Sequence, residues 1–378
     1  MMHLENPYLS NFLLIVFIIF IACTIKQLLF YWGIFSRLAF FREKKKIIKK
    51  QPVSVVLCAK NEYYNLKKNL QVILEQDYFD FEVVVVNDSS NDESIDLLNE
   101  LSTKYQNLKI VDIKQNLNFF SGKKFPLSLG IKSAKNELIL LTDADCKPSS
   151  KNWISKMVSN FGNKTEIVLG YGPYYKRKDF LNKLIRFDTL HIAIQYLSFS
   201  MCGLTYMGVG RNLAYRKSLF YKSKGFISHY KIKSGDDDLF INRVANKNNT
   251  QIEIDPETFT FSEAEKTFSG WIKQKKRHLS TGKYYKKKFL FFLGNFSLSQ
   301  SLFYPTFIIL LCFNYNIYFI LSLFIIRLLS QLFILKKCMN KLNEKKLLVL
   351  SPFLELILII LNPFLLLSNL FVKQNKWK

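Results

Sequence analysis

The stretch Glu137-Leu-Ile-Leu-Leu-Thr-Asp143-Ala-Asp145 decides the fold, because an apolar run of strand length ends in two aspartates. Buried strands of α/β sheets have this composition, and such sheets bind ligands at the carboxyl ends of their strands. Residues i and i+2 of an extended chain point the same way, so both carboxylates can face one Mg²⁺ or Mn²⁺ ion. Short Asp-x-Asp motifs are also common in surface turns, where they only cap or solvate the chain.

The chain from Pro52 onward alternates between strand patterns and helix patterns. The expected strands are Val53–Cys58, Phe81–Val86, Leu108–Ile113, a fourth that ends at Asp143, and Thr165–Gly170. The expected helices are Tyr63–Glu75, Asp92–Tyr105, one from about Pro126, Asp179–Ser200, Gly235–Asn246 and Phe268–Gly282, with a turn-rich segment at Gly208–Asn212. This alternation predicts an α/β domain built of βαβ units, with a mostly parallel sheet covered by helices on both faces.

Apolar segments flank this domain on both sides. Residues 12–25 form a nearly unbroken apolar run, and a bilayer core needs about 20 apolar residues of helix. We therefore expect an uncleaved transmembrane anchor over residues 1–36, a domain over 37–288, and a membrane region with two to three spans over 289–378. The span count is open, because Pro352 and Pro363 could break the last segment into a re-entrant hairpin. The segment near Phe289 could instead lie in the membrane interface as an amphipathic helix.

The charge of the chain is strongly positive, at +25. After the first apolar segment the basic residues are Arg37, Arg42, Lys44, Lys45, Lys46, Lys49 and Lys50, opposed only by Glu43. Cytoplasmic flanks of membrane spans carry such an excess, so residues 37–288 should be cytoplasmic. Few aromatic residues interleave with these clusters, so membrane contact is favoured over nucleic-acid binding. The six cysteines are scattered singly, which argues against a zinc site and fits a reducing compartment.

Acidic and polar motifs follow the expected strands in a fixed order. The motifs are AKNE (59–62), NDSSND (87–92), GKKFPLSLGI (122–131), LLTDADC (140–146), GVGRNLAY (208–215), GDDDLFIN (235–242) and QKKRH (274–278). This order resembles that of the membrane-bound family 2 glycosyltransferases over residues 50 to 285. The resemblance implies an inverting enzyme with the GT-A nucleotide-sugar fold, a UDP-sugar donor, a divalent metal ion and a membrane-associated lipid or glycan acceptor.

The resemblance also implies roles for individual residues. Asp145 would bind the metal on the diphosphate together with Asp143, and Asp237 would be the general base, with Asp236 as the alternative. The residues expected to bind substrate are Ala59, Glu62, Asp88, Lys123 or Lys124, Asp143, Gly210, Asn212, Gln274 and Arg277. His278 stands where processive polysaccharide synthases of this family have a tryptophan that stacks on the acceptor sugar. Processive chain extension is therefore in doubt.

Elementary chemistry supports these roles. A departing nucleoside diphosphate carries negative charge, which a cation at Asp145 and a nearby guanidinium can stabilise. The attacking hydroxyl must lose a proton, and the aspartate next to two others should have a raised pKa that suits a base. The alternative function is a non-catalytic subunit that only binds sugar nucleotides or acts as a scaffold. The sequence leaves the donor sugar, the acceptor and the oligomeric state open.

Overall fold

The computed structural model describes residues 7–42, 51–114 and 122–371. The chain forms two compact units, which we describe separately. The helical unit comprises Met1–Phe41 and Lys287–Leu365, and the sheet unit comprises Arg42–Lys286 and Leu366–Lys378. The basic residues at positions 44 to 50 and Glu43, on which the predicted orientation partly rests, lie outside the described residues.

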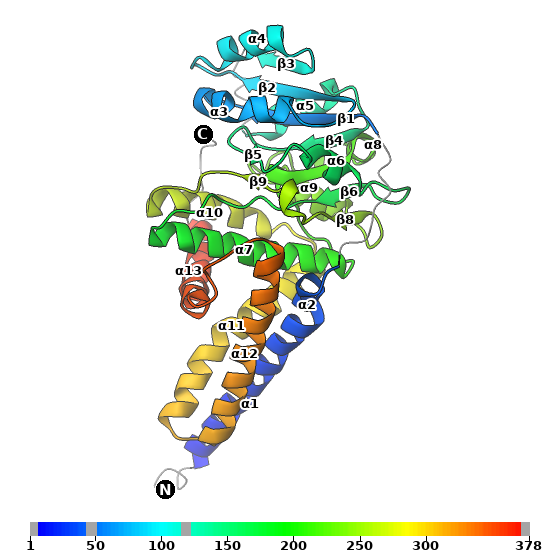
Figure 1. Ribbon diagram of the computed structural model, residues 1–378. Coiled ribbons are helices and arrows are strands. Elements are labelled where there is room, and N and C mark those ends of the chain that lie inside the picture. The colour runs from blue at the N-terminus through cyan, green and yellow to red at the C-terminus, as the bar shows by residue number, and fades with distance from the viewer. Residues whose placement is uncertain (1–6, 43–50, 115–121, 372–378) are drawn as a thin grey trace. The chain divides into compact units, whose positions relative to one another are not determined.

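The sheet unit is built on a seven-stranded sheet with the strand order β3-β2-β1-β4-β7-β6-β8 (Figure 1). The strands are β1 (Val53–Ala59), β2 (Phe81–Asp88), β3 (Leu108–Ile113), β4 (Leu138–Leu141), β6 (Ile167–Leu169), β7 (Leu213–Arg216) and β8 (Thr250–Ile252). The first four are parallel, and β7 runs antiparallel to both of its neighbours, β4 and β6. A separate pair consists of β5 (Lys147–Pro148) and β9 (Thr260–Phe261). The predicted α/β fold with a mostly parallel sheet is confirmed.

Helices cover both faces of this sheet. The helices of the unit are α3 (Tyr63–Leu74), α4 (Ser94–Lys104), α5 (Lys124–Ser133), α6 (Trp153–Val158), α7 (Phe180–Met201), α8 (Lys217–Lys222), α9 (Asp238–Val244) and α10 (Phe268–Gly282). Side chains of α3, α4 and α6 share a core with alternate strand residues such as Val55 and Val83. On the opposite face α5 lies close to the sheet, because a Cβ on Gly130 would come within 2.7 Å of Val56.

Several local features differ from the sequence-based expectations, and two of them affect the site. The fourth strand ends at Leu141 rather than at Asp143, so the aspartates lie in the following loop. Strand β7 was not expected, because its four residues follow a turn-rich segment and are too few to show a periodic pattern. It nevertheless lies in the middle of the sheet, where Leu213 pairs with Leu141.

The order of the strands determines where a ligand can bind. Strand β1 pairs with β2 on one side and with β4 on the other. The connection after β1 therefore leads to one side of this strand, and the connection before β4 leads back to its other side. Open α/β sheets bind ligands in the crevice at such a point, outside the carboxyl ends of the strands. Ala59 closes β1, and Asp143 follows β4 at the same edge.

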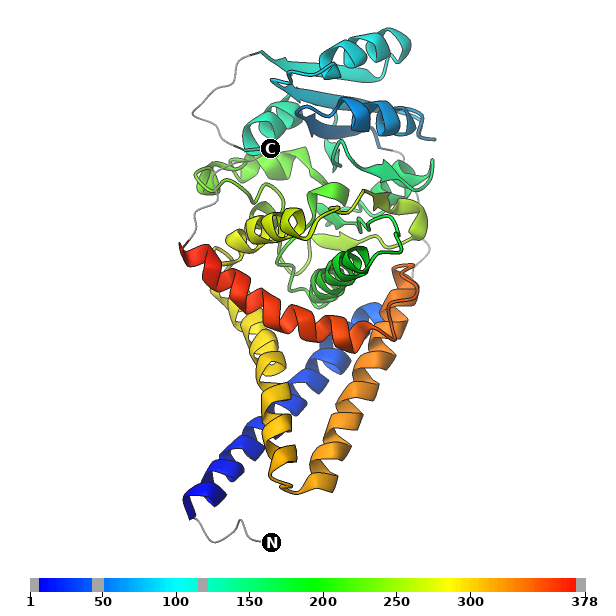
Figure 2. The same cartoon turned by 90° about the vertical axis from the view of Figure 1, so that its left-hand side faces the viewer.

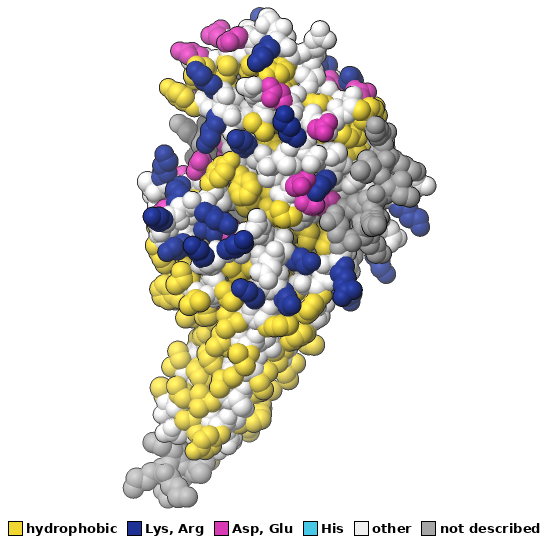
Figure 3. Space-filling model, viewed as in Figure 1, with side chains coloured by type: hydrophobic (Ala, Val, Ile, Leu, Met, Phe, Trp, Pro, Cys, Tyr) yellow, Lys and Arg dark blue, Asp and Glu magenta, His cyan; other side chains and the backbone are white. Residues whose placement is uncertain are grey.

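The helical unit contains long apolar helices. They are α1 (Pro7–Leu29), which continues through a π-helical turn (Phe30–Phe35) into α2 (Ser36–Ala39), α11 (Lys287–Cys312), α12 (Ile317–Lys341) and α13 (Ser351–Phe371). Hydrophobic side chains gather over α1, α11 and α12 (Figure 3). Among the described residues, four helical segments are long and apolar enough to cross a membrane. The expectation of a membrane protein is supported, while the orientation stays a prediction.

The last apolar segment is one helix, although it contains Pro363. In the helical unit α1, α11 and α12 run alongside one another, whereas α13 runs across them (Figure 2). A helical hairpin broken at Pro352 or Pro363 is therefore not formed.

A buried polar cluster joins the helices of this unit. Arg327 of α12 is fully buried and forms an ion pair of 3.2 Å with Glu355 of α13. Its guanidinium also donates to Gln27, Tyr31, Tyr304 and Gln331. Gln300 and Tyr304 of α11 donate to the same carboxylate, at 2.8 Å and 2.9 Å. Charged side chains in apolar surroundings are stable only when paired and hydrogen-bonded, and here each helix contributes a partner.

Candidate active site

The loops that follow β1 and β2 are tied together by hydrogen bonds. The Asn61 backbone N–H donates to the Ser90 hydroxyl at 2.9 Å, and the Asn91 N–H donates to the Asn61 side chain at 2.8 Å. Asn61 has a φ of 56°, which asparagine tolerates better than most residues. These contacts fix Ala59 and Glu62 beside Asp88, whose carboxylate accepts from Lys60 at 3.4 Å. Three residues predicted to bind the nucleotide are thus brought together.

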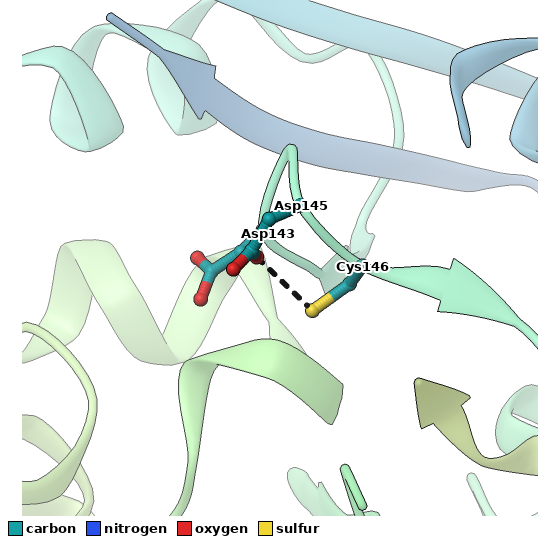
Figure 4. A group of neighbouring side chains, drawn as sticks. All are labelled: Asp143, Asp145 and Cys146. Carbon is teal, nitrogen blue, oxygen red and sulfur yellow. Dashed lines mark hydrogen bonds between the residues drawn. The ribbon is translucent and has the colours of Figure 1, made fainter. Parts of the chain in front are cut away.

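The two aspartates of the deciding stretch lie in a tight turn between β4 and β5 (Figure 4). The Cys146 N–H donates to the Asp143 carbonyl at 3.0 Å and closes the turn. Ligand atoms of Asp143, Asp145 and Cys146 lie within 4.8 Å of one another. The carboxylates therefore converge because of a turn, and not because an extended strand points them to one side.

This group of side chains fits a hard divalent cation. Burial raises the pKa of the Cys146 thiol well above its usual range, and the thiol donates to Asp145 at 3.5 Å. The sulfur is therefore protonated and does not compete as a soft ligand. Burial and the neighbouring Asp143 raise the pKa of Asp145, as expected where two carboxylates lie close together without a metal ion. Carboxylate oxygens are the ligands that Mg²⁺ and Mn²⁺ prefer.

The two lysines of the GKKFPLSLGI motif have different environments. The Lys123 ammonium forms an ion pair with Asp143 and also interacts electrostatically with Asp236. The Lys124 ammonium is buried and donates to the carbonyls of His229, Ile232 and Ser234 at 2.5 to 2.8 Å. Burial lowers the pKa of Lys124 to about 8. Lys123 is thus the lysine that faces the aspartates, and Lys124 holds the loop that precedes the aspartate cluster.

The three consecutive aspartates are separated by their contacts. Asp237 caps α9, since its two oxygens accept from the backbone N–H groups of Gly210 at 2.8 Å and Asp238 at 2.7 Å. Asp238 is buried and accepts from the hydroxyls of Thr281 and Tyr285. Helix α9 begins at Asp238, and its cap is Asp237, the residue that the sequence analysis named first as the general base.

Asp236 differs from its two neighbours. Within the described part of the chain its carboxylate has no hydrogen bond to another residue, and it is partly exposed. Burial and the neighbouring Asp237 raise the pKa of Asp236 to about 6, although Lys123 opposes this shift. The pKa of Asp237 is also raised to about 6, by burial and by Asp238. Of the three, Asp236 is the carboxylate whose oxygens are available to a ligand.

The GVGRNLAY motif contributes backbone and scaffold contacts. Gly210 holds Asp237 through its backbone N–H. Asn212 is fully buried, and its amide donates to the carbonyls of Tyr171 at 3.0 Å and Thr258 at 2.7 Å while accepting from Trp153. Its side chain therefore holds the scaffold together, which corrects the expectation that Asn212 contacts the substrate.

The QKKRH motif lies on α10. Gln274 lies near Tyr174, where burial, the larger effect, raises the pKa of the hydroxyl overall and Gln274 lowers it. Arg277 acts on the loop of Asp143 and Asp145, since its charge, together with Arg211 and Lys123, favours the ionised form of Asp143. Burial alone would raise the pKa of Asp143, but the Lys123 ion pair together with the charges of Arg211 and Arg277 lowers it. Gln274 and Arg277 thus face the side of the site that carries the aspartates.

Arg211 and Tyr174 were not among the predicted site residues. The guanidinium of Arg211 lies 4.3 Å above the ring of Tyr174, close to the aspartate turn. The position of Arg211 inside a recognised motif could have indicated it. Tyr174 lies in a segment without a motif, so only the tertiary structure brings it to the site.

Comparisons with known proteins agree with this geometry. Residues 54–223 match the sequence model of glycosyl transferase family 2. The chain is 29% identical over 262 residues to the probable glycosyltransferase YdaM of Bacillus subtilis, covering 66% of this chain and 59% of that protein. It is 27% identical over 132 residues to the UDP-Glc:alpha-D-GlcNAc-diphosphoundecaprenol beta-1,3-glucosyltransferase WfaP of Escherichia coli, covering 34% of this chain and 48% of that protein. The matched regions span about half of these relatives.

A solved structure shares the fold. The mannosyltransferase PcManGT from Pyrobaculum calidifontis, in complex with GDP-Man and Mn²⁺, superposes with a TM-score of 0.59 at 16% sequence identity. The superposition covers 87% of this chain and 98% of that chain. The predicted GT-A fold is thereby confirmed.

Proposed function

The chain carries a family 2 glycosyltransferase domain, and we propose that it transfers a sugar from a nucleotide-sugar donor to an acceptor at the membrane. The observation that carries this proposal is the position of Lys123, whose ammonium interacts with both Asp143 and Asp236. The Lys123 ammonium thus lies between a carboxylate pair suited to a metal ion and a carboxylate suited to a base. A non-catalytic subunit would have no need for this combination.

The donor occupies the edge of the sheet at β1 and β4. In this proposal the nucleoside lies between Ala59 and Asp88, and the diphosphate lies at the loop that contains Asp145. Asp145 and Asp143 would hold Mg²⁺ or Mn²⁺, and such an ion would supply positive charge beside the diphosphate. Lys123 and Arg277 add positive charge on the protein side. The bound nucleotide is UDP in our expectation, while the PcManGT structure contains GDP-Man.

Asp236 acts as the general base. Its carboxylate is free of hydrogen bonds to other described residues, and its pKa of about 6 allows it to be ionised near neutral pH while still accepting a proton. The acceptor hydroxyl loses its proton to Asp236 and attacks the anomeric carbon. The bond from that carbon to the diphosphate oxygen breaks, and attack from the opposite face inverts the configuration. Asp237 holds the base loop in place through its bonds to Gly210 and Asp238.

The acceptor is a lipid or a glycan held at the membrane. Four apolar helical segments, each long enough to cross a bilayer, support this class of acceptor. The relative WfaP is named for transfer to a diphosphoundecaprenol-linked sugar. A polyprenyl diphosphate-linked sugar is accordingly the first acceptor to test.

The test is a donor and acceptor screen with the full-length protein in detergent or nanodiscs. A panel of UDP-sugars and GDP-sugars is incubated with Mn²⁺ and with polyprenyl diphosphate-linked sugars, and released nucleoside diphosphate is measured. We expect release that depends on both donor and acceptor and that disappears in the Asp236→Asn variant. Binding of donors without acceptor-dependent turnover across the panel would favour the non-catalytic alternative.

A further inference from the structure

The guanidinium of Arg211 is held in one orientation beside the candidate metal site. It lies over the ring of Tyr174, at 4.3 Å from the ring centre, and one of its terminal nitrogens donates to the Ser262 hydroxyl at 2.9 Å. A guanidinium has five N–H donors. Within the described part of the chain, this bond to Ser262 is the only hydrogen bond that the guanidinium makes.

The backbone of Arg211 is fixed as firmly as its side chain. Its carbonyl accepts from the hydroxyls of Thr142 at 3.0 Å and Thr260 at 2.9 Å. Thr142 directly precedes Asp143 of the metal-binding turn. The residue before Arg211 is Gly210, which holds the aspartate cluster through Asp237. Arg211 therefore lies between the candidate metal site and the candidate base.

The support beneath the guanidinium extends to helix α10. Tyr174 is buried, and Gln274 of α10 lies near its hydroxyl. Glycine at position 172 leaves room for the arginine, since a Cβ there would lie 3.2 Å from the Arg211 Cβ. An aromatic ring below a guanidinium strengthens its position without using its N–H donors. Most of the donors thus stay available to a ligand.

Fixed guanidinium donors suit a phosphate, because the fork of N–H groups can bind two phosphate oxygens at once. We propose that Arg211 binds the diphosphate of the nucleotide donor, positioned for it by Tyr174 and Ser262. The inference rests on the proposed function. The diphosphate is favoured over a phosphate of the acceptor because Arg211 adjoins the turn of Asp143 and Asp145, where a metal-bound diphosphate would lie. In the absence of the donor the same guanidinium neutralises those carboxylates.

The test compares ligands that differ only in their phosphates. Binding of the nucleoside diphosphate and of the corresponding nucleoside is measured by calorimetry, in Mg²⁺, for the full-length protein and for Arg211→Ala. We expect the substitution to weaken diphosphate binding about 10- to 100-fold, the range for hydrogen bonds to charged groups, and to leave nucleoside binding unchanged. Arg211→Lys should fall between the two, because a lysine keeps the charge but loses the fork.

A matched control is Arg216→Gln, which removes the same charge from the same unit. The guanidinium of Arg216 donates to the carbonyls of Thr165 and Gly162 and faces away from the aspartates, so diphosphate binding should be retained. Melting temperatures of all variants identify any loss of folding. Unchanged diphosphate affinity in a folded Arg211→Ala variant would overturn the inference. The inference would also be overturned if the diphosphate affinity stayed the same and only the KM for the acceptor rose. Failure of the wild-type protein to bind any nucleoside diphosphate would instead overturn the proposed function itself.

Discussion

Replacing Asp236 by asparagine should slow sugar transfer strongly while making the protein more stable. The substitution keeps the size of the side chain and removes its charge and its ability to accept a proton. Loss of a general base typically slows a reaction about 10²- to 10⁴-fold, which corresponds to about 3 to 5 kcal/mol in the activation free energy. Donor binding should change little, because Asp236 is proposed to take the proton of the acceptor hydroxyl and not to contact the donor.

The gain in stability follows from the raised pKa of Asp236. The folded protein holds this carboxyl with a pKa of about 6, whereas an unfolded chain has a pKa near its ordinary value of about 3.9. Between these two values the folded state binds more protons, so this group makes the protein less stable as pH rises from about 4 to 6. Above pH 6 the penalty is fully present, on the order of 1 to 3 kcal/mol. Asparagine removes it, so the variant should melt several degrees higher at pH 7.5 and match the wild type near pH 4.

The assay has two parts. Acceptor-dependent release of nucleoside diphosphate is measured between pH 5 and pH 9, and melting temperatures are measured over pH 4 to 8. The wild-type kcat/KM should rise with pH through about 6, as the base ionises, and become flat above it. The Asp236→Asn variant should show residual activity without this rise.

The matched control is Asp237→Asn, one residue away. Asp237 accepts two backbone hydrogen bonds as the cap of α9, and an amide side chain has only one oxygen to replace them. Loss of the cap costs about 1 kcal/mol of stability, while removal of the raised-pKa carboxyl offsets this loss. This variant should therefore gain less stability than Asp236→Asn and retain measurable transfer. Near-normal transfer in Asp236→Asn, together with a dead but stably folded Asp237→Asn, would refute the reasoning and assign the base to Asp237.

The remaining predictions concern the metal and the membrane unit. Chelation should abolish turnover and added Mn²⁺ should restore it, whereas Asp145→Asn should stay inactive at any Mn²⁺ concentration; full activity in excess chelator would exclude this role. Arg327→Ala should lower the stability in detergent by about 3 to 5 kcal/mol, because it leaves the Glu355 carboxylate buried and unpaired. The double variant Arg327→Met with Glu355→Leu should recover most of that loss in thermal unfolding, and no recovery would argue against the ion pair as the cause. An impermeant thiol reagent outside intact cells should label the exposed Cys312, the last residue of α11, and should not label Cys202; the opposite pattern would reverse the topology.

Several features could be predicted from the sequence because they depend on local patterns. Helix α10 was predicted with both of its ends, and β3 likewise, since the periodicity and the flanking residues of each are local. The order of motifs predicted the family whose sequence model matches residues 54–223, and the long apolar segments predicted helices long and apolar enough to cross a membrane. Asp143 and Asp145 were found for the same reason, because an apolar strand that ends in carboxylates is visible within nine residues.

The tertiary structure alone decided which members of each motif take part in the site. Lys123 and Lys124 are neighbours of the same type, and only the packing of α5 directs one to Asp143 and buries the other against carbonyl groups. The roles of Asp236 and Asp237 likewise depend on the backbone N–H of Gly210, which lies 27 residues earlier in the chain and caps α9 through Asp237.

The same limit applies to the residues that the sequence did not indicate. Strand β7 is too short to have a pattern, yet its place beside β4 brings Arg211 to the aspartate turn. Tyr174 reaches the site only because the chain around it folds against Ser262. A local pattern determines what kind of element forms. The partner of an individual side chain depends on contacts between residues far apart in the sequence, and no single stretch of the chain encodes them.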